Sequence, residues 1–183
     1  MPADSLYADV HAKRRRGRAI LFDSDSACLQ GLLDLLAGHA RLTVTRWALT
    51  AAEPLARRLA QQYPFDSRPA DCLRLGWAWA RGQVKLPQAK RAILALHAMA
   101  GEMSSPAEAA CCHALAQACS TVHTPGHAKG LPFYELTGLA LQYAEDFEGP
   151  VTRRIADYTA LLLELAQSPA PGPWAAFLLK PDE

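Results

Sequence analysis

The chain has 183 residues, half of them hydrophobic and a fifth of them charged, and its formal net charge at pH 7 is +1. This length suits a single domain with a substantial core. So small a net charge excludes an overall electrostatic attraction to nucleic acid or to an anionic membrane. No apolar stretch reaches the roughly 18 residues of a membrane span, and no secretory signal pattern is visible. We therefore expect a cytoplasmic protein that does not associate with membranes.

The first charged feature in the chain is the run KRRRGR, residues 13–18. Such a run is either the solvated face of a helix or a patch for nucleic acid or an acidic partner. The solvated face is the favoured interpretation, and nucleic acid is not an expected partner. Residues 1–23 are predicted to form this basic, helical N-terminal segment. A helical core domain is predicted over residues 24–168.

Helical spacing of apolar residues recurs along the core, whereas the alternation typical of strands is nearly absent. Asp25-Ser26 is predicted to cap a first helix, and Gly38 is predicted to end it. The next helix should begin near Ala40. Pro54 fits the first turn of a further helix. The apolar face of the helix that ends at Gly38 consists of Leu29, Leu32, Leu33 and Leu36.

A turn rich in helix breakers, residues 63–69, precedes a helix that Ser67 is predicted to cap and Gly82 to end. Residues 86–101 follow as a helix that is apolar on most sides and therefore central. Ser105 is predicted to cap the next helix, which is rich in alanine and cysteine and has a proline at its first position.

Two more long helices are predicted, one over Phe133–Phe147 and one that starts at Gly149-Pro150. Residues 169–183 are predicted to form a proline-rich linker and a short C-terminal segment that docks through residues 174–178. The sequence thus predicts an all-α fold, a compact multi-helix bundle of about seven to eight helices with short loops.

The stretch that begins at Cys119 carries the strongest candidate chemistry. Cys119, His123 and His127 recur every four residues, which on an unbroken helix would stack them on one face as metal ligands. However, Thr124 stands where helical zinc proteases have a glutamate. Pro125 also interrupts the helix, at a cost of about 3 kcal/mol. We therefore expect the helix to restart here, with both histidines packed in the core and hydrogen-bonded, and no metal.

Five cysteines without a C-x-x-C pair predict free, mostly buried thiols in a reducing compartment. A thiol–imidazole pair, Cys119 with His123 or Cys112 with His113, would need an orienting group and an oxyanion hole that the sequence does not identify. Phosphate-binding glycine loops and the Glu-x-x-His signature are absent. We expect neither a cofactor nor an enzyme. The alternative is a metal- or thiol-dependent enzyme that uses Cys119, His123 and His127.

Two tryptophans on one predicted helix project in different directions. Trp77 is predicted to lie in the core. Trp79 is predicted to lie at an interface, where an exposed tryptophan would anchor a partner protein.

Three stretches carry a family likeness. Residues 47–52 (WALTAA) are similar to a W-A-A-D helix. Residues 66–73 (DSRPADCL) and 78–82 (AWARG) are similar to a D-x-R-P turn followed by a helix that ends in W-x-x-G. Residues 119–134 (CSTVHTPGHAKGLPFY) are similar to the pattern A-x-x-H-x-x-x-H-A-x-G. In this order and spacing, the sequence resembles the Imm-5-like putative immunity proteins of bacterial polymorphic toxin systems.

The resemblance implies an all-helical, non-enzymatic protein that binds and neutralises a toxin domain. Asp66 is then expected to accept hydrogen bonds in its turn and Arg68 to bridge helix ends. Thr50-Ala51 stands where the family has an acidic residue, and Pro125-Gly126 interrupts a stretch that is usually rich in alanine. The residues singled out as partner-binding or structural are Trp79, Asp66, Arg68, His123, His127 and Tyr134.

Overall fold

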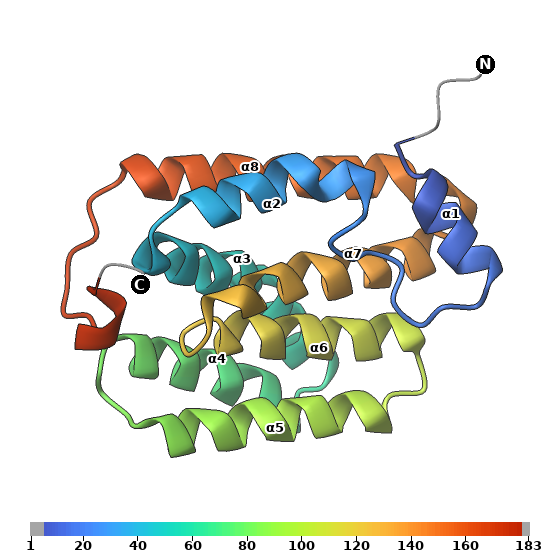
Figure 1. Cartoon of the computed structure of the whole chain (residues 1–183). Helices are drawn as coiled ribbons and strands as arrows, with labels where there is room; N and C mark the ends of the chain where they lie inside the picture. Colours follow the sequence, from blue (N-terminus) through green and yellow to red (C-terminus); the bar gives the residue numbers. More distant parts are fainter. Residues whose placement is uncertain (1–5, 181–183) are drawn as a thin grey trace.

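The computed structural model describes residues 6–180, and within that range it contains eight α-helices, four short 3-10 helices and no strand (Figure 1). The expected all-α bundle is therefore confirmed. Residues 1–5 of the predicted N-terminal segment and 181–183 of the predicted C-terminal segment lie outside the described range. The α-helices are α1 (Ala8–Arg15), α2 (Gln30–Gly38), α3 (Arg41–Gln62), α4 (Arg68–Ala80), α5 (Leu86–Glu102), α6 (Pro106–Ser120), α7 (Gly130–Tyr143) and α8 (Glu148–Gln167). The 3-10 helices are η1 (Ala27–Leu29), η2 (Pro125–Lys129), η3 (Ala144–Asp146) and η4 (Ala176–Leu178).

Helix α6 lies at the centre of the bundle and packs against α3, α4, α5 and α7 (Figure 1). Its buried residues are mostly alanine and cysteine, so neighbouring backbones come close. A Cβ added to Gly138 of α7 would lie 3.0 Å from the carbonyl oxygen of Ala107, and one added to Gly76 of α4 would lie 3.1 Å from Cys119 Sγ. Small side chains on both sides of these contacts therefore set the spacing of the helices.

Several predicted helix boundaries hold, among them the end of α2 at Gly38, the start of α3 after Ala40 and the start of α5 at Leu86. The helix predicted over Phe133–Phe147 ends earlier, at Tyr143. Ser105 caps α6, because its Oγ accepts a hydrogen bond from the Glu108 backbone N–H at 3.4 Å. Helix α8 begins at Glu148, next to the predicted start. The prediction that Pro54 starts a new helix is wrong, since α3 runs through it without a break. Leu49 and Leu55, on either side of the proline, are buried in the same core, and this packing keeps α3 continuous.

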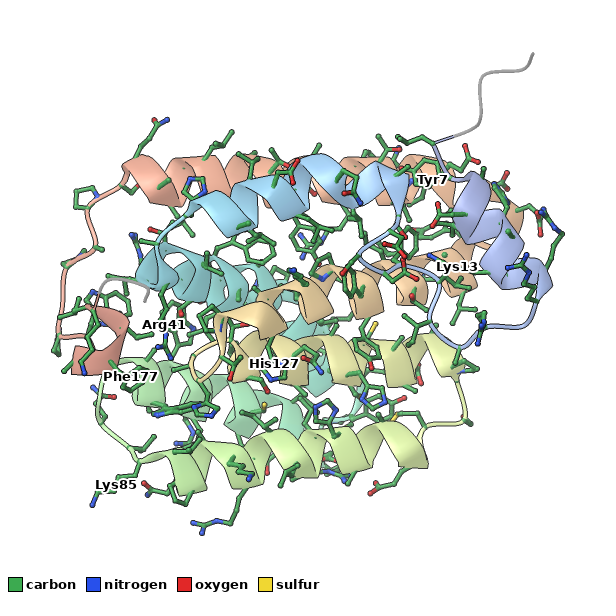
Figure 2. All side chains as sticks on the ribbon, viewed as in Figure 1. Tyr7, Lys13, Arg41, Lys85, His127 and Phe177 are labelled. Atoms are coloured by element: carbon green, nitrogen blue, oxygen red, sulfur yellow. The ribbon has the colours of Figure 1, made fainter. Side chains whose placement is uncertain are left out.

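The chain ends fold back onto the bundle. Lys13 in the basic run forms ion pairs with Asp9 at 2.8 Å and Asp23 at 2.9 Å, so part of the run's charge is neutralised within the molecule. At the other end, the backbone N–H of Ala175 donates to the Ala80 carbonyl at 2.8 Å. The Arg41 guanidinium lies 5.2 Å from the ring centroid of Phe177 (Figure 2). Among the described residues, no helix is both long and apolar enough to cross a membrane.

A polar network joins α3, α7 and α8 inside the core. Trp47 is fully buried and donates its indole N–H to the Tyr158 carbonyl at 2.9 Å. Arg154 donates to both carboxylate oxygens of Glu135 at 3.1 Å and to the Ala51 carbonyl at 2.9 Å. The Tyr158 hydroxyl also donates to Glu135, and burial together with this carboxylate raises the pKa of Tyr158. A buried carboxylate is thus satisfied by two donors from one helix.

The Glu135→Gln substitution tests this network. It leaves the largely buried Arg154 guanidinium without a counter-charge, and we expect the free energy of unfolding to fall by about 2 to 3 kcal/mol. The matched control is Asp71→Asn, which breaks the exposed Arg74–Asp71 pair and should cost less than about 1 kcal/mol. Urea unfolding followed by circular dichroism measures both. Equal losses in the two variants would contradict a structural role for the Glu135 network.

Candidate functional site

The structure does not bring Cys119, His123 and His127 together as a metal site. Cys119 is fully buried, and its thiol donates to the Cys72 carbonyl at 3.4 Å. Contact with Cys72 and burial raise the pKa of this thiol. Among residues 6–180, no group of three or more His, Cys, Asp or Glu side chains is arranged to hold a metal ion. The predicted break at Pro125 is confirmed, because α6 ends at Ser120 and η2 begins at Pro125.

The prediction that His123 and His127 are packed in the core is wrong, because both side chains are exposed. The break after α6 turns the chain outward, so the two residues lie at the surface rather than along a buried helix face. Each still has a protein contact. The His127 Nδ1 lies 2.7 Å from Gln117 Oε1, and the His123 ring stacks on Trp79 with 5.8 Å between centroids.

The prediction that Trp79 is exposed at an interface is wrong, whereas Trp77 packs against the core, as predicted, but is only partly covered. Trp79 is only 5% exposed, between the His123 ring and the Phe177 ring, whose centroid lies 6.1 Å away. Trp77 is only half-buried, and its ring centroid lies 6.5 Å from that of Trp174. The reason is that the C-terminal segment and the turn after α6 both cover the Trp79 side of α4. Trp79 is therefore the inner wall of a site and not an exposed anchor.

A surface groove of about 240 Å³ lies between α5 and the turn that joins α6 to η2. We call it the histidine groove. Figure 2 shows His127 close to this turn. Trp79 and two of the predicted histidines meet here, although they come from stretches more than 40 positions apart in the sequence. The groove is lined by Trp79, Leu86, Lys90, Ile93, Leu94, His97, Ser120, His123 and His127.

The sequence considered His113 only as a partner of Cys112 and did not single out His97, yet the rings of these two histidines are in direct contact. Their Nδ1 atoms lie 2.7 Å apart, which requires that one nitrogen donates and the other accepts. The ring of Tyr134 packs on His113 with 5.1 Å between centroids. Tyr134 thus supports the groove through His113 and His97. No local spacing signals this pair, because it depends on how α5 and α6 are aligned.

The pKa values of three histidines in or beside the groove are lowered. Burial lowers the pKa of His97, and the neighbouring His113 and His127 lower it further. Burial also lowers the pKa of His113, and the partial desolvation of the His127 ring together with the nearby His123 lowers that of His127. A lowered pKa disfavours the protonated form, so His97, His113 and His127 offer polar contacts with little positive charge.

Asp66 and Arg68 lie outside the histidine groove. Asp66 accepts hydrogen bonds from the Arg68 backbone N–H at 3.0 Å and from its guanidinium, and these bonds lower the pKa of Asp66. Arg68 also donates to Glu102 at the end of α5, at 2.8 Å. The two residues therefore have the expected contacts: the aspartate accepts bonds in its turn, and the arginine bridges helix ends.

A second hollow of about 500 Å³ contains the Cys111 thiol, which accepts a hydrogen bond from Arg58 at 2.7 Å. Burial raises the pKa of Cys111 to about 11 and that of Cys112 to about 12. Since the thiolate is the reactive form, neither thiol is activated near neutral pH. The Cys112–His113 pair considered from the sequence therefore lacks an activated nucleophile.

The depressed histidine pKa values predict how stability depends on pH. A histidine whose folded pKa lies below its unfolded value of 6.5 binds fewer protons in the folded state, so stability falls as the pH decreases below that value. We expect thermal stability to fall from pH 7 to pH 5, and the His97→Gln/His113→Gln double variant to show a shallower fall. Differential scanning calorimetry from pH 7 to pH 5 measures the melting temperature of both proteins. If the melting temperature falls equally with pH in both, the lowered pKa values of His97 and His113 are not the cause.

Comparison with protein families supplies an independent finding. A family model for Imm-5 like putative immunity proteins matches residues 34–161. This range is well over half of the chain and contains every residue that lines the histidine groove. Comparison with curated proteins and with solved structures gave no match. The chain therefore belongs to the Imm-5 like putative immunity protein family.

Proposed function

We propose that the protein is an immunity protein that binds a bacterial toxin domain and neutralises it without catalysing a reaction. The observation that carries this proposal is the family match, which spans α3 to α7 in full. An immunity protein of this kind covers a toxin's active surface with a complementary one, and complementary charges speed the encounter. Such a protein needs a shaped, rigid surface and no catalytic residues of its own.

The histidine groove has the features that this role requires. Most of its wall residues lie on α4, α5, the end of α6 and η2, and only His123 lies on the turn, so most of its shape is set before a partner arrives. It combines apolar side chains with imidazoles and an ammonium group, a mixture typical of protein interfaces. Leu94 on its edge is 56% exposed, and Trp79 forms its inner wall. We infer that this groove is the centre of the toxin-binding surface.

Binding rather than catalysis also agrees with the state of the reactive side chains. The pKa values of Cys111, Cys112 and Cys119 are all raised, and those of His97, His113 and His127 are lowered. All five cysteines are free thiols, which suits a reducing cytoplasm. We place the protein in the bacterial cytoplasm, where a toxin must be blocked before it harms its own producer.

Co-expression tests the proposal. A bacterial host that makes the toxin domain encoded beside this gene should stop growing, and co-expression of the present protein should restore growth. The purified pair should also elute as one complex in size-exclusion chromatography, since growth rescue by neutralisation requires stable association.

Specificity provides the control. An unrelated toxin should arrest growth whether or not the protein is present. If the protein rescues growth against none of the toxin domains encoded next to it, and forms no complex with any of them, the proposed function is wrong.

A further inference from the structure

The chain segments that supply the walls of the histidine groove have an unusual charge composition, and Lys90 is the one charged residue among those that line it. All the lining residues come from segments 79–101 and 109–134. These two segments contain no aspartate and no glutamate, although the whole chain has 18 acidic residues. They also hold four of the six histidines of the chain, His97, His113, His123 and His127. Their lysines and arginines are Arg81, Lys85, Lys90, Arg91 and Lys129.

The polar and apolar groups occupy different parts of the groove wall. Leu86, Ile93 and Leu94 of α5 supply the apolar part, and Leu94 is largely exposed. Lys90 lies on the same helix, one turn before Leu94, and is exposed. His97 follows one turn after Ile93. A partner segment that fills the groove must therefore cover apolar surface and place its polar group between an ammonium and an imidazole.

We infer that the histidine groove binds a partly apolar segment of the toxin domain that carries at least one carboxylate. The inference rests on the proposed function and specifies the chemistry of the partner. A carboxylate would accept hydrogen bonds from Lys90 and from the groove imidazoles, and no like charge on the groove walls would oppose it. A cationic segment would find no counter-charge there, so charge complementarity selects an acidic one.

Protonation should couple to this binding. The charged and titratable groups around the groove come from several elements: Lys90 and His97 of α5, His113 of α6, and His123 and His127 around η2. Another element is α3, where the Arg41 guanidinium donates to the His123 carbonyl at 2.7 Å. Lys129 follows on η2 and Tyr134 on α7. Because these neighbours are cationic or neutral, the unoccupied groove disfavours imidazolium. A bound carboxylate favours imidazolium, so binding should take up protons and tighten as the pH falls.

A pair of charge-reversed variants tests the location and the chemistry. Lys90→Glu places a carboxylate in the groove. Arg153→Glu makes the same charge change at an exposed site on α8, on the far side of the molecule from α5 (Figure 1). Titration calorimetry with the purified neighbouring toxin domain should show affinity reduced about tenfold or more by Lys90→Glu and less than about twofold by Arg153→Glu.

The pH dependence gives a second measurement on the same complex. Affinity should rise several-fold between about pH 8 and pH 6, with proton uptake visible as a dependence of the binding enthalpy on the buffer. The His97→Gln/His127→Gln double variant should lose most of this rise. If the toxin binds but Lys90→Glu matches Arg153→Glu and the affinity does not change with pH, the groove inference is overturned while the proposed function stands.

A peptide probe separates failure of the inference from failure of the proposed function. If no neighbouring toxin domain binds, the proposed function fails. Binding of a carboxylate in the groove is then tested separately with a short peptide of alternating leucine and glutamate. Nuclear magnetic resonance should then show shifts at His97, His127 and the Trp79 indole at about millimolar peptide. The matching peptide of leucine and glutamine should cause none. Equal shifts from both peptides, or no shifts from either, would overturn carboxylate recognition.

Discussion

The close packing around α6 is the constraint on which the rest of the structure depends. Four helices surround it, and they approach closely because its buried side chains are mostly alanine and cysteine. Gly76 shows how tight this packing is, since a Cβ there would lie 3.1 Å from Cys119 Sγ and 3.2 Å from Leu49 Cδ2, both in buried side chains. Any larger side chain on the buried faces of α6 would push a neighbour outward. The thiols of α6 therefore act as packing atoms, in agreement with their raised pKa values.

The same packing decides where the histidine groove forms. In the second half of α6 the half-buried positions are His113, Gln117 and Ser120, at spacings of four and three, so they lie on one stripe between α5 and η2. Each contributes to the groove: His113 contacts His97, Gln117 contacts His127, and Ser120 lies in the wall. The groove is thus the one side of this half-helix that the neighbouring helices leave uncovered, and its polar residues follow from that partial exposure.

The sequence predicts the fold better than the site, for identifiable reasons. Helix ends such as the Ser105 cap and the break at Pro125 depend on local chemistry, which residue spacing reveals. The prediction of a new helix at Pro54 is wrong because the burial of Leu49 and Leu55 outweighs the free-energy cost of a proline inside α3. The burial of Trp79 and the contact of His97 with His113 depend on how separate helices align, which no short pattern records. The stretches that carry the family likeness nevertheless contain Trp79, His123 and His127, and the structure shows that these three residues line one groove.

The net charge of +1 does not describe how the charges are distributed along the chain. Acidic residues are absent from segments 79–101 and 109–134 and lie elsewhere, where several form ion pairs: Asp66 and Glu102 with Arg68, Glu135 with Arg154, and Asp9 and Asp23 with Lys13. The residues that line the groove include Lys90 and no acidic side chain, so the charge of the groove wall is positive although the molecule is almost neutral. Weak overall attraction to nucleic acid and specific attraction to one acidic segment are therefore compatible, because the first depends on total charge and the second on local charge.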